Sequence, residues 1–546
     1  MNTENFQTHP DRYVHWKLEM DGPVARLRLN VQEERGFRAG YTLKMNSYDL
    51  GVDLELADAI SRLRFEHPEV RVLVLTSDQD RMFSAGANIY MLQSSSHAFK
   101  VNFCKYTNET RLWLEEFSRE SGVTTVAALN GTASGGGYEL AISCDEIHLI
   151  DDGNSAVSLP EVPLLGVLPG TGGLTRLVDK RKVRRDLADL FSTLAEGVRG
   201  HKALKWNLVD YVHPRSKFAE QIEARLGELL EQPARVLREG KGLRLEPVTF
   251  ERTGDRLTYR HVVLELDDDR RVARLTVRAP ADPQPDTPEA LRAAGDRAWV
   301  LAAWRELDDA LLQLRLANNE IGVVVLRTEG ELEQVAAADR LLVEHDGDWL
   351  VHEVRLHVAR VLRRLDNTSK SLFAVIDEGS CFGGSLFEIA LAADRSFMLN
   401  DPEANVAIQV GPLSAGALPM SQGQSRLDCR FLGAPEQARA ALLQTGPIDA
   451  DGAGELGLVT FTPDDIDWED EVRIAIEERA SLSPDALTGM EQNLRFAGAE
   501  TLETKIFGRL SAWQNWIFTR PNATGESGAL TLYGKPERAA FDWKRT

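Results

Sequence analysis

Apolar and polar residues follow two different periods along the first half of the chain. The segment 24–31 alternates residue by residue, as a half-buried strand does, and 70–76 is a short apolar run typical of a buried strand. Between them, 54–65 repeats its apolar positions with the period of an amphipathic helix. A helical stretch at about 89–119 and an apolar strand at 123–129 continue the succession. Strands that alternate with helices predict a layered α/β fold or a spiral, not a helical bundle.

The second half of the chain repeats the first at an offset of about 250 residues. The paired segments are VARL at 24 and 272, VRVLVL and IGVVVL ending at 75 and 326, the glycine-rich stretches around 135 and 384, and WNLVD at 206 with LGLVT at 456. Four similarities in the same order predict two copies of one fold. The expected domains are 1–235, a seam at 236–265, a second copy at 266–470 and a helical C-terminal region at 471–546.

Three consecutive glycines, Gly135–Gly137, lie between the strand at 123–129 and a following helix. Residues without a Cβ let other groups approach the backbone closely, and the first N–H groups of a helix have no intrahelical partner. The helix dipole adds positive potential at the same place. The junction therefore predicts a site for an oxygen that carries negative charge. Glu139, in the first turn of the helix, is close enough to serve the same bound atom.

The two copies differ at this junction and beyond it. The second copy lacks FSAGA after its buried strand and has Ser385 at the end of its glycine run. We expect Gln409 at the position that corresponds to Glu161 in the segment LPEV. Because a neutral amide cannot take a proton as a carboxylate does, the second copy is predicted to be a non-catalytic partner.

Three motifs resemble those of the crotonase, or enoyl-CoA hydratase/isomerase, superfamily: FSAGAN at 83–88, NGTASGGGYELAISCD at 130–145 and SLPEVPLLGVLPGTGGLTRL at 158–177. The resemblance implies tandem crotonase-like spirals of ββα repeats, the second copy degenerate, that bind acyl-CoA thioesters. It implies that the oxyanion-hole N–H groups belong to Ala87 and Gly136. Glu139 and Glu161 fall on the positions of the paired catalytic glutamates.

Further candidates surround these groups. The usual family loop continues with Asp and then a basic residue, whereas here Asn88 and Tyr90 occupy those places. Positive charge for the CoA phosphates is therefore expected from Lys44 or Arg81. Cys104 lies on a helical stretch that can roof the acyl pocket in this fold, as an inert buried thiol or with a role near the substrate ring. The other expected substrate contacts are Ser84, Ala85, Asn88 and Gly135.

The chemistry of these groups fits thioester activation. Fixed N–H donors stabilise an enolate-like oxygen, and two neighbouring carboxyls ionise at different pH, so that one serves as acid and the other as base. Double length, an intact first copy and the tail from Arg509 resemble a ring-cleaving branch of the superfamily. This implies hydrolytic cleavage of 2,3-epoxybenzoyl-CoA to 3,4-didehydroadipyl-CoA semialdehyde and formate. Two alternatives stay open: a conventional enoyl-CoA hydratase, and a non-catalytic acyl-CoA-binding scaffold.

The composition of the chain limits the binding partners and the cellular location that we expect. The chain has 43% hydrophobic and 27% charged residues and a net charge of −21, which argues against sequence-independent nucleic-acid binding. We find neither a signal-peptide core nor an apolar run long enough to span a membrane, and the four cysteines lack paired metal spacing. We therefore expect a cytoplasmic enzyme with an acyl-CoA substrate and no cofactor or metal. We also expect homo-oligomers, with a dimer favoured.

Overall fold

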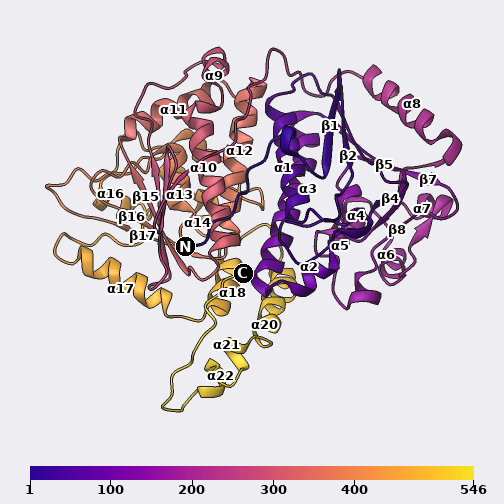
Figure 1. The fold of residues 1–546 in the computed structure, drawn as a ribbon. Coiled ribbons are helices and arrows are strands. Elements are labelled where there is room, and N and C mark those ends of the chain that lie inside the picture. The colour runs from indigo at the N-terminus through magenta and orange to yellow at the C-terminus, as the bar shows by residue number, and fades with distance from the viewer. The chain divides into compact units, whose positions relative to one another are not determined.

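The computed structural model describes residues 1–546 and divides them into two compact units. The N-terminal unit is Phe6–Pro247, and the C-terminal unit is Val248–Thr546 together with Met1–Asn5. In Figure 1 the N-terminal unit runs from indigo to magenta, and the C-terminal unit continues to yellow. The division falls inside the stretch 236–265, and the tail from 471 belongs to the C-terminal unit.

The N-terminal unit is built on a six-stranded sheet. Its strands are, in spatial order, β1 (Trp16–Asp21), β2 (Val24–Leu29), β3 (Val72–Ser77), β5 (Thr124–Leu129), β7 (Glu146–Asp151) and β10 (Tyr211–Pro214). The first pair is antiparallel and every later pair is parallel. All six residues of β3 are buried, because both faces of the sheet are covered.

A smaller four-stranded sheet turns this arrangement into a spiral. Its strands are β4 (Arg81–Ser84), β6 (Gly131–Ser134), β8 (Ala156–Ser158) and β9 (Val198–Arg199). Each of β3, β5 and β7 in the main sheet is followed directly along the chain by a strand of the small sheet and then by a helix. This succession confirms the predicted spiral of ββα turns. It places the chain ends of β4, β6 and β8 side by side, where the site lies.

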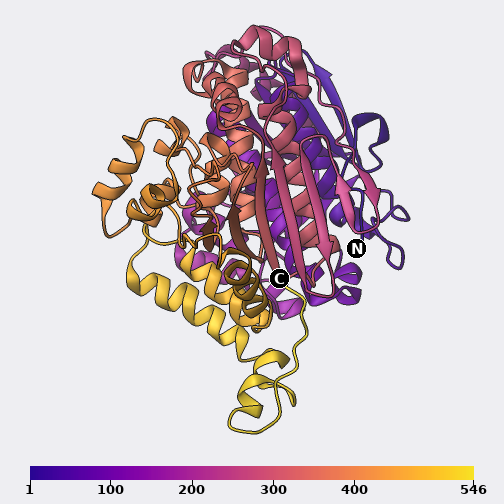
Figure 2. The same cartoon turned by 90° about the vertical axis from the view of Figure 1, so that its left-hand side faces the viewer.

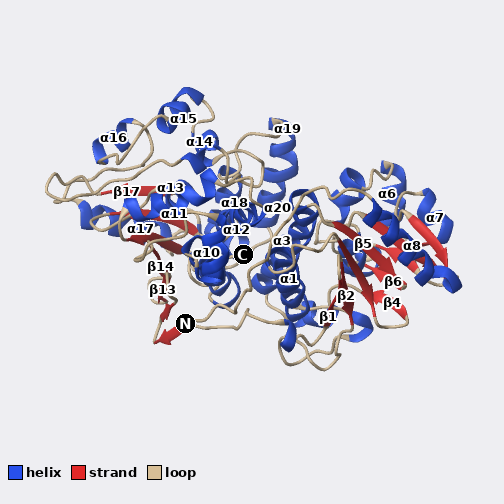
Figure 3. Ribbon diagram, turned by 90° about the horizontal axis from the view of Figure 1, so that it is seen from above, coloured by secondary structure: helices blue, strands red, loops and turns tan.

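Helices cover both faces of the main sheet. On one side α1 (Leu50–Phe65) packs against α3 (His97–Ser121). On the other side α8 (Phe218–Glu231) inserts Phe218, Ile222, Leu226 and Leu229 into an apolar cluster with side chains from β2, β3, β5 and β7. Figure 3 shows the helices and strands of each unit in separate colours. The remaining α-helices of four or more residues in this unit are α2 (Ile89–Ser94), α4 (Gly136–Ala141), α6 (Arg185–Ser192) and α7 (Gly200–Lys205).

The sheet of the C-terminal unit, whose long strands face the viewer in Figure 2, has the same central strand order as the main sheet of the N-terminal unit. It contains β11 (Glu251–Thr253), β12 (Arg256–Thr258), β13 (Val262–Asp267), β14 (Val272–Arg278), β15 (Val323–Glu329), β16 (Ser371–Ile376) and β17 (Arg395–Met398). The strands β13–β14 are antiparallel and β14 to β17 are parallel, as β1–β2 and β2, β3, β5, β7 are in the N-terminal unit. The C-terminal unit has no second sheet, because β15 leads into α11 (Leu332–Glu344) where β3 leads into β4.

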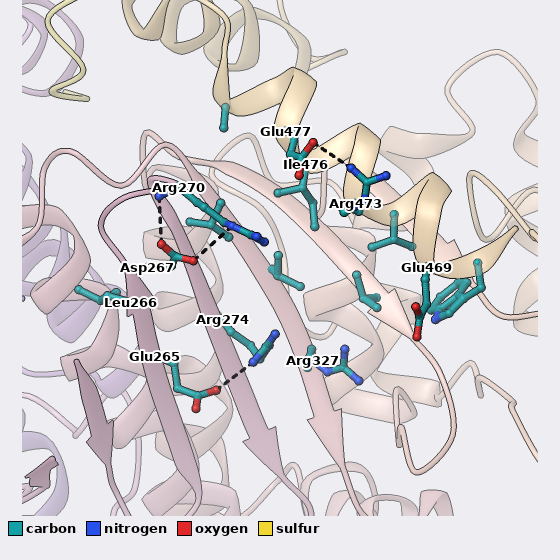
Figure 4. Close-up of a pocket in the computed structure, with 16 residues that line it drawn as sticks. Glu265, Leu266, Asp267, Arg270, Arg274, Arg327, Glu469, Arg473, Ile476 and Glu477 are labelled. Atoms are coloured by element: carbon teal, nitrogen blue, oxygen red, sulfur yellow. Dashed lines mark hydrogen bonds and ion pairs between the residues drawn. The ribbon is translucent and has the colours of Figure 1, made fainter. Parts of the chain in front are cut away.

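Helices of the C-terminal unit also lie on both faces of its sheet. Besides α11, the α-helices of this unit are α9 (Pro288–Ala294), α10 (Trp299–Leu312), α12 (Trp349–Asp366), α13 (Gly384–Leu391), α14 (Arg426–Arg430), α15 (Pro435–Leu442), α16 (Ala450–Glu455), α17 (Trp468–Ala480), α18 (Pro484–Leu494), α19 (Leu502–Lys505), α20 (Ser511–Ile517), α21 (Pro521–Thr524) and α22 (Ala529–Leu532). Only part of α17 packs closely on the sheet, and a cavity of about 760 Å³ lies between this helix and strands β13 to β16 (Figure 4). None of the helices is both long enough and apolar enough to cross a membrane.

Candidate active site

The loop after β4 presents one unbonded backbone N–H. Gly86 has φ +84°, and its N–H donates to Ser84 Oγ at 3.0 Å. Tyr48 clamps the loop on the other side: its N–H donates to Gly86 O at 2.9 Å, and its carbonyl accepts from Asn88 N at 2.8 Å. In this parallel pairing the Ala87 N–H, between the two bonded residues, points away from Tyr48 and has no acceptor in the protein.

The glycine turn after β6 presents a second unbonded backbone N–H. Gly135 has φ +53°, and its N–H donates to Ser158 O at 2.9 Å. The following helix α4 begins at Gly136, and no side chain caps it, so the Gly136 N–H is also unbonded. A Cβ on Gly86 would lie 2.5 Å from Gly136 N, which shows how closely the two loops approach. The unbonded amides of Ala87 and Gly136 therefore lie on adjoining loops.

Glu139 is buried one turn into α4 and is held by backbone donors. Its Oε1 accepts from Thr171 N and from Gly173 N, both at 2.8 Å. Burial raises the pKa of Glu139, and the two N–H groups oppose that rise. The carboxylate forms no ion pair; the two amides stabilise its charge most, with smaller contributions from the charges of Arg111 and Arg176.

The turn that supplies these donors is itself anchored. Arg176 donates from Nη1 to Thr171 O at 2.9 Å and makes a two-pronged ion pair with Glu115. On the other side, Asn108 donates to Gly170 O at 2.8 Å. The position of Glu139 thus depends on a turn fixed by a nearly buried arginine.

Glu161 begins a short helical turn, Glu161–Leu165, directly after β8. Its Oε2 is buried without a hydrogen-bond partner, and a Cβ on Gly135 would lie 2.6 Å from its Oε1. Burial raises the pKa of Glu161 to about 7, with a further contribution from the charge of Glu139. The two carboxyls therefore lie close enough to interact, in environments that differ: Glu139 has two donors and Glu161 has none from its neighbours.

Cys104 lies at the same place. A Cβ on Gly170 would lie 3.6 Å from its Sγ, and burial together with the charge of Glu139 raises the pKa of the thiol to about 11. At neutral pH this group is a thiol and not a thiolate, so it can donate a weak hydrogen bond but is a poor nucleophile.

The other predicted contacts divide into two groups. Ser84 and Asn88 are buried and shape the loop: Ser84 Oγ donates to Asn46 O, while Asn88 caps α2 and donates to Thr42 O and Ser47 Oγ. Ala85 donates to Met45 O at 3.2 Å, which places the exposed Lys44 beside the loop. Arg81 begins β4, at the end of the strand away from Ala87, and lies near Asp80.

Sequence reasoning missed two features of the site. The first is the pair of amides of Thr171 and Gly173, which hold Glu139. The second is Tyr48, whose buried hydroxyl lies against Gly136 without a hydrogen-bond partner. The glycine pair in GTGG was a usable signal for the turn at 170–173, whereas a tyrosine in KMNSYD follows no pattern that distinguishes it from a core residue.

Known proteins resemble this chain over different lengths. Residues 42–252 match the enoyl-CoA hydratase/isomerase family. The whole chain resembles the benzoyl-CoA-dihydrodiol lyase of Aromatoleum evansii, with 53% identity over 547 residues, 99% of this chain and 98% of that protein. The chain belongs to the benzoyl-CoA-dihydrodiol lyase family. The similarity that defines this membership extends through both units, whereas the match to the enoyl-CoA hydratase/isomerase family ends near their boundary.

More distant relatives cover only part of the chain. The crotonyl-CoA hydratase of Syntrophomonas wolfei is 30% identical over 34% of this chain and 68% of that protein. The crystal structure of an enoyl-CoA hydratase from Geobacillus kaustophilus aligns over 40% of this chain and 75% of that chain, with 32% identity and a TM-score of 0.35.

In this family member the C-terminal copy has a different site. Gly384 N donates to Gln409 O at 3.0 Å, the counterpart of the bond from Gly135 N to Ser158 O. Gln409 therefore corresponds to Ser158, and the prediction that it occupies the place of Glu161 is wrong. Counted onward from this bond, Pro412 falls at the position of Glu161, and both begin a helical turn that ends at a left-handed glycine. The loss of a carboxylate stands, but the residue that replaces it has no acid–base group at all.

The donor that corresponds to Gly136 N is also occupied. Ser385 N donates to Asp339 Oδ2 at 2.6 Å, and Asp339 comes from α11, the helix that replaces β4 and the Ala87 loop. Glu388, the counterpart of Glu139, accepts from Ser414 Oγ at 2.6 Å and pairs with Arg426 at 3.3 Å. The C-terminal copy thus satisfies internally the groups that the N-terminal copy leaves unbonded.

Proposed function

We propose that this protein is a carbon–carbon lyase that cleaves the ring of 2,3-epoxybenzoyl-CoA hydrolytically. With two molecules of water, the substrate would yield 3,4-didehydroadipyl-CoA semialdehyde and formate. The observation that carries the proposal is the pair of unbonded amides, Ala87 N–H and Gly136 N–H, next to two unequal carboxyls. The name of the relative from Aromatoleum evansii supports an aromatic acyl-CoA as the substrate class.

The thioester oxygen is bound between the two amides. Electron density moves onto this oxygen when the α-carbon gains negative charge, and preorganised N–H donors stabilise it by roughly 3 kcal/mol each. Because the thioester is itself the electron sink, the proposed reaction needs neither a metal nor a redox cofactor.

The two glutamates have separate roles in this proposal. Glu139, whose charge two amides stabilise, takes a proton from the first water. Glu161, with its pKa near 7 and no donors to stabilise its charge, gives a proton to the epoxide oxygen as the C–O bond opens. The difference between the environments of the two carboxyls supports this division of roles.

Carbon–carbon cleavage follows. The bond between the two epoxide carbons breaks when the epoxide isomerises to its seven-membered cyclic enol ether (oxepin). The first water adds to the ring carbon next to the α-carbon, and opening of the C–O bond at that carbon leaves an aldehyde at each former epoxide carbon. The second water adds to the aldehyde carbon next to the α-carbon. The bond between these two carbons breaks, that carbon leaves as formate, and the bonding pair enters the thioester enolate before the α-carbon takes a proton. Cys104 lies within reach of the acyl group as a neutral thiol, and Lys44 is the candidate contact for the CoA phosphates, with Arg81 in second place.

Incubation with synthetic 2,3-epoxybenzoyl-CoA tests the proposal. Formate and a semialdehyde CoA ester are the expected products, detected enzymatically and by mass spectrometry. Hydration of crotonyl-CoA without formate from the epoxide would favour a conventional hydratase instead. Binding of CoA esters without turnover would favour a scaffold.

A homodimer is proposed for the active form, and light scattering checks it.

A further inference from the structure

The hydroxyl of Tyr48, like Glu161 Oε2, is a buried polar group of the site without a hydrogen-bond partner in the protein. Tyr48 is 3% exposed, and its hydroxyl has no hydrogen-bond partner. A Cβ on Gly136 would lie 2.1 Å from this oxygen, so the hydroxyl lies against the Cα of the residue that presents the second unbonded N–H. The side chains of Glu139 and Thr171 lie close enough to influence it.

The tyrosine is held firmly in this place. Its backbone is bonded on both sides to the Ala87 loop. The Arg111 guanidinium lies 5.2 Å from the centre of its ring, and Arg111 is in turn paired with the buried Asp53. Phe103 packs against the ring at a centroid distance of 6.2 Å. A side chain fixed this well cannot turn its hydroxyl to another acceptor.

A buried hydroxyl without a partner is unfavourable in the free protein, because it has lost its bonds to water and gained none. Thr171, whose side chain influences the Tyr48 hydroxyl, lies 3.3 Å from Thr107 Oγ1. The C-terminal copy has a larger residue, Ser385, where Gly136 leaves room for this hydroxyl. The N-terminal copy thus keeps both a small residue and an unsatisfied donor at one point.

We propose that the Tyr48 hydroxyl donates a hydrogen bond to an oxygen of the bound acyl group, beside the two backbone N–H groups. The inference rests on the proposed function, to which it adds a third donor. Burial raises the pKa of Tyr48 further above its ordinary value, so the group stays protonated and acts as a donor, not as a base. Its target is an oxygen that gains negative charge during the reaction: the thioester oxygen or the oxygen released when the epoxide opens.

The test compares Tyr48→Phe with wild type in turnover of 2,3-epoxybenzoyl-CoA, in calorimetric affinity for benzoyl-CoA, and in melting temperature. We expect kcat to fall at least tenfold and affinity to fall three- to tenfold, because the donor acts on the bound ester and more strongly as charge develops. The melting temperature should be unchanged or higher, since an unsatisfied hydroxyl has been removed. A purely structural tyrosine would give the opposite thermal result.

Tyr13→Phe is the matched control. The Tyr13 hydroxyl donates to Asp58 Oδ2 at 2.5 Å, so its loss should lower the melting temperature and leave kcat unchanged. The inference is overturned if Tyr48→Phe keeps kcat and affinity within twofold of wild type, or if its melting temperature falls as that of Tyr13→Phe does. Should wild type release no formate, the proposed function fails, and the affinity for benzoyl-CoA alone decides the role of Tyr48.

Discussion

The two glycine turns of this protein use the same backbone donor in opposite ways. In the C-terminal unit, Ser385 N is bonded to the carboxylate of Asp339, which comes from a helix of that unit. In the N-terminal unit, the equivalent Gly136 N is left unbonded, next to the equally unbonded Ala87 N. The comparison shows that a carboxylate oxygen fits this donor. It also shows that the fold can supply such an oxygen itself, so leaving the position open is a specific property of the first copy.

The buried glutamates of the two turns teach the same lesson. Glu388 is neutralised by Arg426, which also pairs with Asp366, so its charge is part of a closed network. Glu139 receives only amide donors and lies near a second carboxyl whose pKa is raised to about 7, so that about half of it is protonated at neutral pH. A buried carboxylate can therefore act as a structural ion or as a reactive base on one scaffold, and its partners decide which.

Glu161→Gln should give the largest difference between the copies. Removal of the proton donor is expected to lower kcat by about 10²–10⁴ and to leave the affinity for benzoyl-CoA within a few fold. Steady-state assays of formate release and calorimetry measure the two. Glu388→Gln, in the C-terminal unit, is the control: it should destabilise the protein but keep the kcat of the folded fraction. Equal losses of kcat in both variants would contradict the assignment.

Gly136→Ala should come second. A Cβ at this position would lie 2.1 Å from the Tyr48 hydroxyl, so the helix start must shift and its N–H with it. We expect a loss of about 10²-fold in kcat, the usual effect of losing one oxyanion donor. Ser385→Ala makes the corresponding change in the C-terminal copy, where kcat should stay within twofold. Wild-type turnover in Gly136→Ala would remove this amide from the mechanism.

The dependence of kcat on pH should report the ionisation of Glu161. Because its protonated form delivers the proton, kcat is expected to fall about tenfold per pH unit above about 7. The free energy of unfolding also depends on this group. Because the pKa of Glu161 is higher in the folded than in the unfolded chain, the protein loses stability as pH rises from about 4.5 to about 7. Glu161→Gln should therefore melt higher than wild type at pH 8 and show no such gain at pH 4. Thermal scans at the two values check this, and a gain at pH 4 alone would contradict it.

Asp339→Asn should affect stability only. Burial raises the pKa of Asp339 to about 7, so wild type loses stability as pH rises from about 3.8 to about 7. Asparagine keeps a carbonyl acceptor for Ser385 N without the charge, and we expect a gain on the order of 1 kcal/mol at pH 8. Denaturant titration of the variant measures it. A tenfold change in kcat would instead show that the C-terminal site takes part in turnover.

The smallest expected effect concerns the helices that cover the two sheets. Arg26 on β2 makes a two-pronged bond to Glu223 on α8, whereas in the C-terminal unit the corresponding residues are Arg274 and Arg473, both lining the cavity. In Figure 4 Arg274 of β14 pairs with Glu265 of the neighbouring strand β13, and Arg473 pairs with Glu477 of the same helix, α17. Because Arg274 and Arg473 are both positively charged, they form no ion pair with each other across the cavity.

Glu223→Arg would reproduce this like-charged pair in the N-terminal unit. Since the original bridge is partly exposed, we expect a loss of at most about 1 kcal/mol, measured by denaturant titration. The charge-reversed pair Arg26→Glu with Glu223→Arg serves as the control and should recover most of that loss. A loss of several kcal/mol, or no recovery, would show that the pair does not act as a simple bridge.

The sequence predicted more of the fold than of the candidate site. Apolar periodicity predicted strands that alternate with helices, in a layered α/β fold or a spiral, because strand and helix periods are local signals in the sequence. The spiral of ββα repeats was implied by the family resemblance. Motifs identified Ala87, Gly136, Glu139 and Glu161, which the structure brings together. The register of Gln409 failed because the stretch from Gly384 to Gln409 is longer than that from Gly135 to Ser158. Tyr48 reaches the site through a contact between segments distant in the chain, for which one sequence holds no signal.

The turn at Thr171–Gly173 links two events that are usually considered separately. Its N–H groups are the only donors to Glu139 Oε1, and the turn owes its own place to Arg176 and Asn108. A displacement of this turn would therefore remove both donors from the carboxylate at once and make it harder to ionise. In the proposed mechanism, a substitution that loosens the turn would impair water activation without changing either glutamate.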